Sequence, residues 1–413
     1  MTTTPLAACR SCGETGLELI LSLGEMPLAN SLPTAEQLDT PDPRYPLDLA
    51  FCGGCALVQI TETVPPETMF RDYLYFSSFS DTMLRHAREI AERLADARGL
   101  GPGSLVVEVA SNDGYLLQNY HRRGIPVLGI EPAVNVAEVA RAERGIRTLS
   151  EFFGEGLARR LSGEGSRADV IHANNVLAHV PDLNGFVRGL GALLKDEGVA
   201  VIEVPYVKEL IDRCEFDTIY HEHLCYFSLA ALDRLFGRHG LVISDVERIP
   251  IHGGSLRLFV ARGGAGAGRG PAAERLLEEE AGWGVDRAEF YRGFARRVEG
   301  LRTSLRDLLF DLKRRGNRLA AYGAAAKGST LLNYFGLGPE TLDFVVDRST
   351  YKQGRYMPGV RLPIHAPAKL LEDRPDYVLL LAWNFAEEVL AQQAEYRGGG
   401  GRFIIPVPSP SVV

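Results

Sequence analysis

The stretch LVVEVASNDGYLLQNYHRRGIPVLGIE, residues 105–131, decides the fold. It opens with the apolar run LVVEV, which predicts a buried strand, and continues into a turn of small and polar residues at 110–114. The pattern then predicts a helix over 115–123 and a second apolar strand over 127–130, with Glu131 directly after that strand. Strand, turn, helix and strand in this order predict a βαβ unit with two parallel strands.

The turn of this unit predicts a ligand site. Small residues let the backbone approach a ligand closely, and a carboxylate at the end of the second strand can bind the two hydroxyls of a ribose. The turn lacks the G-x-G-x-x-G pattern of dinucleotide sites, which favours a class I S-adenosyl-L-methionine (SAM) site. We then expect Glu108 and Asp113 to face the cationic methionine end of SAM and Glu131 to bind its ribose. A βαβ unit without any ligand is the alternative.

The alternation of strands and helices continues around this unit. Apolar spacing predicts a helix over 81–98, strands over 168–175 and 199–204, and between these strands a helix over 183–195 that ends in a turn at 196–198. Such an order builds a doubly wound parallel sheet, whose ligand crevice lies at the carboxyl ends of the strands. The polar residues expected near these ends are Asn112, Asp113, Glu131, Asn174, Asn175, His179 and Glu203.

A second α/β pattern occupies the C-terminal part of the chain. The glycine-rich residues 261–270 predict a flexible linker, and residues 271–315 are charged and helical in character. The expected strands then follow at 318–322, 342–347, 377–383 and 402–405.

The turn at 323–330 leads from the first of these strands into a helix. A helix N-terminus that carries Lys327, Ser329 and Thr330 is a good cradle for a diphosphate. The turn is not a Walker A sequence, so nothing indicates hydrolysis of a nucleoside triphosphate. A nucleotide fold that is kept only for packing is the alternative.

Four of the six cysteines form two C-x-x-C pairs, Cys9 with Cys12 and Cys52 with Cys55. Two intervening residues let both sulfurs of a pair point at one metal, and four thiolates supply the closed tetrahedral shell of a structural Zn²⁺. A disulfide or redox pair is the alternative, disfavoured because no signal peptide is apparent. Residues 26–48, between the pairs, hold five prolines and are expected to be poor in regular structure.

Proton-transfer groups cluster in the sequence YHEH at 220–223. The cluster offers a phenol, two imidazoles and a carboxylate that can orient an imidazole. A His-x-His pair could instead bind a metal, but no third ligand stands at a persuasive spacing. His179 and His252 are further candidates.

Composition limits the classes of function. The 413 residues, 46% hydrophobic and 24% charged, are typical of a globular protein of two to three domains. A net charge of −8 argues against nucleic-acid binding. No apolar run approaches the ~20 residues of a membrane span, so we expect no membrane partner and a cytoplasmic location. Cys214 and Cys225 are expected to be ordinary buried residues.

The joint occurrence of these motifs resembles one enzyme family. In order, the chain carries the two C-x-x-C pairs, EVASNDG at 108–114, LAHVP at 177–181, YHEH at 220–223, IHGGSLR at 251–257 and YGAAAK at 322–327. Over nearly its whole length it resembles the SAM-dependent sugar C-methyltransferases of antibiotic deoxysugar pathways. Those enzymes methylate C3 of a TDP-linked 4-keto-2,6-dideoxysugar.

The resemblance implies an α/β protein of three domains. These are a zinc-binding domain over 1–75, a Rossmann-like SAM-binding methyltransferase domain over 76–262, and a second Rossmann-like domain over 271–413 that helps to hold the nucleotide-sugar. It implies SAM and a structural Zn²⁺ as cofactors, a TDP-linked 4-keto sugar as substrate, and a monomer or weak homo-oligomer. The alternatives are an O- or N-methyltransferase of another nucleotide-sugar or secondary metabolite, and a catalytically dead zinc-stabilised nucleotide-binding module.

The resemblance also implies a set of site residues. Proton transfer falls on His223, Tyr220 and Glu222, with His179 nearby and Tyr75 from a substrate-side loop. The general base is His223 or, second, Tyr220, and the donor to the C4 oxygen is His179 or Tyr220. Related sequences can carry Asp where this chain has His221, which leaves His221 open as the base. The zinc ligands are Cys9, Cys12, Cys52 and Cys55; the SAM residues are Glu108, Asn112, Asp113, Gly114, Glu131, Asn174 and Asn175; the substrate residues are Ser77, Ser78, His252, Lys327, Ser329 and Thr330.

Overall fold

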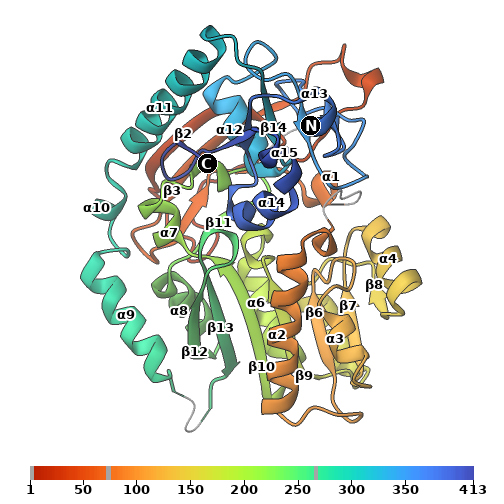
Figure 1. The fold of residues 1–413 in the computed structure, drawn as a ribbon. Coiled ribbons are helices and arrows are strands. Elements are labelled where there is room, and N and C mark those ends of the chain that lie inside the picture. Colours follow the sequence, from red (N-terminus) through yellow and green to blue (C-terminus); the bar gives the residue numbers. More distant parts are fainter. Residues whose placement is uncertain (1–3, 71–75, 265–267) are drawn as a thin grey trace.

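The computed structural model of the chain describes residues 4–70, 76–264 and 268–413 (Figure 1). Its strands form three larger sheets and one small sheet of β1 (Thr4–Pro5) and β5 (Glu62–Thr63). In Figure 1 the N-terminal and C-terminal parts share the upper half of the molecule, and the central part forms the lower half. Within the described ranges, every helix is too short or too polar to span a lipid bilayer.

The central sheet has seven strands and confirms the predicted doubly wound architecture. The strands from β10 to β8 are parallel to one another, whereas β13 runs antiparallel to both of its neighbours. Because β6, β7, β9 and β10 are parallel, their carboxyl ends meet at one edge of the sheet. In sheet order the strands are β12 (Leu241–Ile249), β13 (Ser255–Arg262), β10 (Leu194–Pro205), β9 (Ala168–Asn174), β6 (Val106–Val109), β7 (Val127–Ile130) and β8 (Thr148–Leu149).

Helices cover both faces of this sheet because its strands are apolar on both sides. Val106 and Val170 pack in a core with α2 (Asp81–Ala97) and α3 (Leu117–His121). Their strand neighbours Val107 and Ile171 point the other way, since side chains alternate along a strand. They pack in a second core with α5 (Glu155–Gly163), α6 (Leu183–Leu193) and α8 (Leu229–Gly237). The remaining helices here are α4 (Val134–Arg144) and α7 (Val207–Asp212).

The N-terminal sheet is antiparallel and takes one strand from the central part of the chain. Its strands, in order, are β11 (Cys225–Tyr226), β4 (Val58–Ile60), β3 (Arg44–Phe51) and β2 (Glu18–Pro27). The prediction that residues 26–48 lack regular structure is wrong at both ends, because β2 reaches Pro27 and β3 begins at Arg44. Pro46 is tolerated inside β3, where the pairing with β2 is irregular.

Two similar turns hold the cysteine pairs. In the first, Gly13 N–H donates to Cys9 O at 2.9 Å, and in the second Ala56 N–H donates to Cys52 O at 2.8 Å. Gly13 and Ala56 both have positive φ, 78° and 63°, which closes each turn tightly. The strand pairing between β2, β3 and β4 then brings the two turns together.

The four cysteine sulfurs form the predicted cluster. They all lie within 4.8 Å of one another, with Cys9 Sγ 3.5 Å from Cys55 Sγ and Cys12 Sγ 3.6 Å from Cys52 Sγ. A tetrahedron of thiolates around Zn²⁺ at ~2.3 Å has sulfur–sulfur edges of about 3.8 Å, so the cluster fits this metal. Cys214 and Cys225 are buried elsewhere, as expected.

The C-terminal sheet repeats the α/β pattern of the central one. Its first five strands are parallel, and β19 runs antiparallel to β18. In order they are β16 (Ile364–His365), β15 (Val345–Val346), β14 (Leu319–Tyr322), β17 (Tyr377–Leu380), β18 (Arg402–Ile405) and β19 (Ser411–Val412). The helices of this part of the chain are α9 (Pro271–Trp283), which packs on α8 and β12 of the central part, α10 (Ala288–Tyr291), α11 (Phe294–Arg314), which packs on β2, α12 (Ala326–Phe335), α13 (Lys369–Asp373), α14 (Ala386–Gln392) and α15 (Ala394–Gly398).

Some predicted boundaries differ from the structure for identifiable reasons. The turn expected at 196–198 lies inside β10, which absorbs these residues as an irregularity in its pairing with β9. The helical region 271–315 is broken into three helices, because Gly284 and Gly293 adopt positive φ. The strand expected over 342–347 is confined to Val345–Val346.

The three sheets are joined by polar contacts at their seams. Tyr356 N–H donates to Pro33 O at 2.9 Å, and Arg361 pairs with Asp42 at 3.2 Å, which ties the N-terminal part to the C-terminal part. Glu388 of α14 accepts the Thr82 N–H at 3.1 Å and so caps the N-terminus of α2.

Removal of one thiolate should release the metal and destabilise the fold. We expect the purified protein to hold one zinc per chain and Cys12→Ser to lose most of it, because three thiolates no longer close the tetrahedral shell. The midpoint of thermal unfolding of Cys12→Ser should fall, since metal-binding free energy contributes to folding. Elemental analysis and calorimetry measure both effects. Cys214→Ala, outside the cluster, is the control and should keep its zinc; equal zinc content in both variants would contradict the assignment.

Candidate active site

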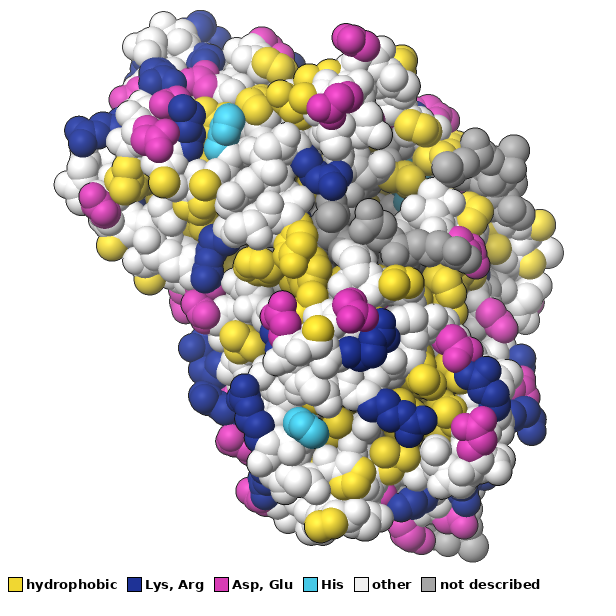
Figure 2. Space-filling view, turned by 90° about the vertical axis from the view of Figure 1, so that its right-hand side faces the viewer, with side chains coloured by type: hydrophobic (Ala, Val, Ile, Leu, Met, Phe, Trp, Pro, Cys, Tyr) yellow, Lys and Arg dark blue, Asp and Glu magenta, His cyan; other side chains and the backbone are white. Residues whose placement is uncertain are grey.

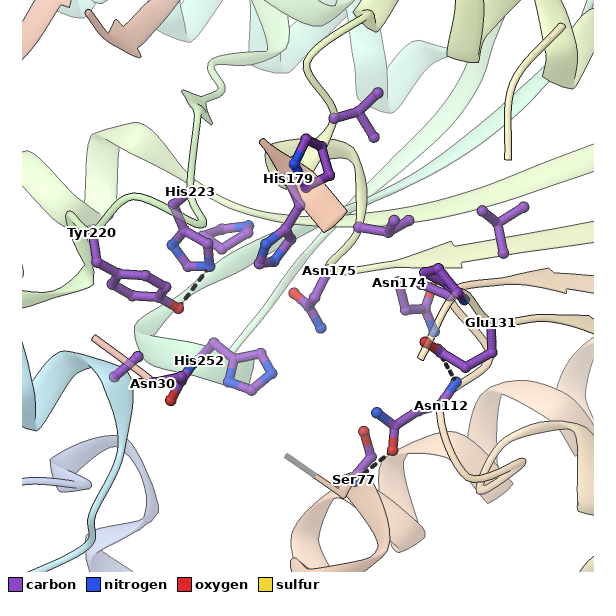
Figure 3. Close-up of a pocket in the computed structure, with 18 of the residues that line it drawn as sticks. Asn30, Ser77, Asn112, Glu131, Asn174, Asn175, His179, Tyr220, His223 and His252 are labelled. Atoms are coloured by element: carbon purple, nitrogen blue, oxygen red, sulfur yellow. Dashed lines mark hydrogen bonds between the residues drawn. The ribbon is translucent and has the colours of Figure 1, made fainter. Parts of the chain in front are cut away.

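A cavity of about 520 Å³ lies where the three sheets meet. It runs along the carboxyl edge of the central sheet, and all three parts of the chain line it, including Asn30, Asn175 and Lys327. On the face shown in Figure 2, apolar side chains (yellow) gather along the seam between the upper and lower halves of the molecule. Figure 3 shows the polar side chains that point into the cavity.

At one end of the cavity, Glu131 holds the turn that follows β6. Its carboxylate accepts the Asn112 N–H and the Ala133 N–H, each at 2.9 Å. Burial raises the pKa of Glu131 to about 7, although these two hydrogen bonds favour its charged form. The turn itself is sharp, since Ala110 and Asn112 both have positive φ (55° and 48°). The Asn112 side chain in turn accepts the Ser77 N–H at 2.9 Å.

Three of the predicted SAM residues, Glu108 of β6 and Asp113 and Gly114 of the turn after it, do not line the cavity. Asp113 pairs with Arg144 at 3.0 Å and accepts a hydrogen bond from Ser78. Neither Asp113 nor Ser78, both predicted site residues, lines the cavity. Glu108 is buried in the core, where burial and the nearby carboxylates hold its pKa well above the ordinary value. Gly114 has φ +78°, and a Cβ there would lie 3.2 Å from Ile146. Glu108, Asp113 and Gly114 thus do not line the cavity, and a role of Glu108 and Asp113 toward the methionine end of SAM stays a prediction.

The end of β9 supplies the next part of the wall. Asn174 and Asn175 follow one another at the strand's carboxyl end, and the positive φ of Asn175, 54°, redirects the chain there. His179 also lines the cavity, and its ring lies edge-to-face with that of His223 at 4.7 Å between centroids. Burial lowers the pKa of His179 to about 4, although the backbone carbonyls of Glu222 and Asn175 oppose this shift. His179 is therefore neutral at pH 7.

Tyr220 and His223 form a hydrogen-bonded pair in the middle of the cavity (Figure 3). The Nδ1 of His223 lies 2.9 Å from the carbonyl oxygen of Thr218, and a carbonyl can only accept, so Nδ1 carries the proton. Nε2 is then the lone-pair nitrogen and accepts the Tyr220 hydroxyl at 2.8 Å. Burial and the charge of Lys327 hold the pKa of His223 well below its ordinary value. The pair thus presents a neutral base of defined tautomer.

The other two residues of the YHEH sequence point elsewhere. His221 Nε2 contacts the carbonyl oxygen of Pro46 at 3.1 Å, and its ring packs edge-on against Tyr45, so it faces the N-terminal sheet. Glu222 accepts a hydrogen bond from Asn30 Nδ2 at 2.7 Å. Of the two histidines, only His223 lines the cavity. Asn30 was missed by the sequence analysis, because an Asn in a proline-rich segment carries no local signal.

The C-terminal domain closes the far end of the cavity with two lysines, Lys327 and the buried Lys352. Lys327, at the N-terminus of α12, donates to Asn384 at 2.9 Å and lies 4.5 Å above the ring of Trp383. Burial lowers the pKa of Lys327. Lys352 donates to the Ala324 carbonyl at 2.8 Å and was not predicted, since it stands in a loop without a motif.

The remaining predicted residues divide between the cavity and its surroundings. His252 lines the cavity, and burial, together with the charge of Lys327, lowers its pKa to about 3. Ser77 lines it as well. Thr330 is buried and donates to the Ile219 carbonyl at 3.2 Å, and Ser329 is buried beside it in α12. Tyr75 lies outside the residues that the structure describes.

Comparisons with known proteins cover each part of the chain. Three family models match in order: a putative zinc binding domain over residues 9–70, a methyltransferase domain over 82–246, and a C-methyltransferase C-terminal domain over 250–408. The C-methyltransferase NovU of Streptomyces niveus is 37% identical over 409 residues, which are 99% of this chain and 97% of NovU.

More distant relatives match the central part. The ubiquinone biosynthesis O-methyltransferase of Azorhizobium caulinodans is 28% identical over 125 residues, 30% of this chain and 47% of that protein. The crystal structure of magnesium protoporphyrin IX methyltransferase from Synechocystis PCC 6803 with bound SAM covers 43% of this chain and 79% of its own, at 15% identity and a TM-score of 0.34.

The similarity to NovU runs through the zinc-binding, central and C-terminal parts alike. The four clustered sulfurs, the seven-stranded sheet with its Glu131 turn, and the second α/β sheet are the parts that the family models describe. The chain therefore belongs to the family of SAM-dependent C-methyltransferases that includes NovU.

Proposed function

We propose that this C-methyltransferase methylates C3 of a TDP-linked 4-keto-deoxysugar, in the biosynthesis of a branched deoxysugar of an antibiotic. The observation that carries the proposal is the Tyr220–His223 pair, a neutral base in the wall of a cavity that extends from Glu131 to Lys327. Methyl transfer to oxygen or nitrogen needs no carbon acid to be deprotonated. Methyl transfer to carbon does, and a positioned neutral imidazole supplies that base.

The Glu131 end of the cavity suits SAM. The carboxylate of Glu131 stands at the carboxyl end of β7, where it can accept hydrogen bonds from a ribose, and Asn112 and Asn174 line the wall beside it. When bound, SAM supplies a methyl group on a sulfonium, which is an electrophile. The protein's task at this end is to orient that ligand toward the histidines.

The middle of the cavity suits a carbon acid. A C–H bond next to a ketone becomes acidic because the C4 carbonyl delocalises the charge as an enolate. His223 Nε2 takes the C3 proton once the Tyr220 hydroxyl has turned from its lone pair to the C4 oxygen, while Thr218 holds Nδ1–H and keeps the ring in place. The Tyr220 hydroxyl, 2.8 Å from Nε2 in this structure, then serves as the donor to the C4 oxygen, and the His179 ring packs against that of His223.

The far end suits the nucleotide diphosphate. The N-terminus of α12 presents backbone N–H groups and Lys327 to the cavity, which favours an anion. Lys352 adds a second cation to the same wall. An elongated ligand anchored here places its sugar between His179 and Tyr220.

The direct test is incubation with SAM and a panel of TDP-linked 4-keto sugars. We expect a product heavier by one methylene, with NMR placing the new methyl group on C3. A methyl group on oxygen or nitrogen, or no product from any sugar of the panel, would refute the proposal.

Glu131 should set the affinity for the SAM product, S-adenosylhomocysteine, and its dependence on pH. Glu131→Gln loses charge-assisted hydrogen bonds, each worth about 1.5–3 kcal/mol, so we expect a dissociation constant at least about 10-fold higher. In the wild type the pKa of about 7 means that Glu131 takes up a proton as the pH falls from 8 to 6, and affinity should fall with it. Calorimetry at several pH values measures both effects. A Gln variant with unchanged affinity and the same pH profile would exclude this role.

His223 should be required for loss of the C3 proton even without methyl transfer. We expect exchange of C3–H with deuterated water when the 4-keto sugar is supplied, followed by mass spectrometry or NMR. His223→Asn should slow this exchange by at least about 100-fold and Tyr220→Phe by about 10-fold, since a general base contributes 10²–10⁴. His221→Asn, which alters a histidine outside the cavity, is the matched control and should exchange within about threefold of the wild type. Equal effects at 221 and 223 would overturn the assignment.

A further inference from the structure

Residues Phe216 to Ile219 lie between the C-terminal domain and the imidazole of His223. Three of them contact that domain. The Phe216 ring stacks on Phe335 with centroids 4.8 Å apart. The Asp217 carboxylate accepts the Trp383 indole N–H at 2.7 Å, and the Ile219 carbonyl accepts the Thr330 hydroxyl at 3.2 Å. The segment is thus fixed to α12 and to the loop that follows β17.

The remaining residue of the segment, Thr218, hydrogen-bonds to the imidazole of His223, the proposed base. Its carbonyl accepts the His223 Nδ1–H at 2.9 Å and also contacts the Tyr226 hydroxyl at 3.4 Å. A neutral imidazole has one N–H, so this bond leaves Nε2 free of a proton. If the Thr218 carbonyl moved away, the proton could reside on Nε2, and His223 could no longer accept one there.

Asp217 is an unusual residue to find at this position. It is fully buried, and its carboxylate lies behind the cavity wall rather than in it. A buried carboxylate is costly unless it is hydrogen-bonded or near a cation. Here Trp383 supplies the hydrogen bond and Lys327, whose ammonium lies above the Trp383 ring, supplies the charge. Lys327 also lines the cavity, at the end proposed to hold the diphosphate. The Asp217–Trp383 contact that fixes residues 216–219 is therefore next to that part of the cavity wall.

We propose that Asp217 and Thr330 are positioning residues through which the C-terminal domain fixes the tautomer and orientation of His223. This inference rests on the proposed role of His223 as the base. It assigns the C-terminal domain a part in proton abstraction in addition to holding the nucleotide. Thr330, predicted to touch the diphosphate, acts instead through the Ile219 carbonyl.

The test compares Thr330→Val, which keeps the shape but removes the hydroxyl, with Thr330→Ser, which keeps the hydroxyl. ¹⁵N NMR of the full-length protein labelled at histidine reports the tautomer of His223, whose signals are assigned by their loss in His223→Asn. We expect the Nδ1–H tautomer in the wild type and in Thr330→Ser, and a mixture with the Nε2–H tautomer in Thr330→Val. The C3–H exchange rate should fall by about 10- to 100-fold in Thr330→Val only.

Binding and a second variant separate positioning from loss of structure. Calorimetry with TDP should give dissociation constants within about threefold of the wild type for both Thr330 variants, because Thr330 does not line the cavity. Asp217→Asn keeps an oxygen for the Trp383 N–H but loses the attraction to Lys327, and should slow exchange less than Asp217→Leu.

Each outcome decides the inference. A wild-type tautomer and exchange rate in both Thr330→Val and Asp217→Leu would overturn it, as would a loss of exchange matched by an equal loss of TDP binding. If the wild type itself shows no C3–H exchange, the proposed function fails, but the NMR comparison still reports whether Thr330 sets the His223 tautomer.

Discussion

The pairing of β11 with β4 is the contact on which the site depends. Cys225 lies opposite Gln59 in this pairing, only two residues after His223. Leu224, between them, donates its N–H to Ala178 at 2.7 Å and accepts the Ile60 N–H at 3.0 Å. The chain that carries the proposed base therefore becomes a strand of the N-terminal sheet two residues later. His179 and His223 come together because the Leu224 N–H bonds to the carbonyl of Ala178, each residue being the chain neighbour of one of the two histidines.

The same β11–β4 pairing connects the cysteine cluster to the cavity through the backbone, so the metal need not take part in the reaction. Gln59 donates to Cys9 Sγ at 3.1 Å and accepts the Arg10 N–H at 3.1 Å, so one side chain of β4 supports a zinc ligand. Hydrogen bonds of this kind around a metal orient its ligands. The backbone of Gln59 pairs with β11. A structural zinc that fixes β4 thereby also fixes the strand next to His223, which explains why a closed, non-catalytic metal shell belongs to this enzyme.

The sequence was informative where function depends on local pattern. The βαβ unit with Glu131 at its end lies within residues 105–131, and each C-x-x-C turn lies within a few residues, so spacing alone predicts them. The contacts that select His223 over His221 join residues far apart: His221 meets Pro46, and Glu222 meets Asn30. No periodicity encodes such pairings. Alternation along a strand would even have misled, because residues 220–224 form a turn and not a strand.

The electrostatics of the cavity constrain how the proposed base can work. Burial lowers the pKa of His179 to about 4 and that of His252 to about 3, and holds that of His223 well below its ordinary value. Burial therefore keeps His223 neutral and able to accept a proton, but it also disfavours the imidazolium that forms. An enolate about 4 Å away would stabilise the imidazolium by about 4 kcal/mol at an effective dielectric constant of 20. In the proposed reaction the proton is thus accepted only when a carbon acid leaves its negative charge beside the ring, so the site favours proton transfer from a bound carbon acid over protonation by water.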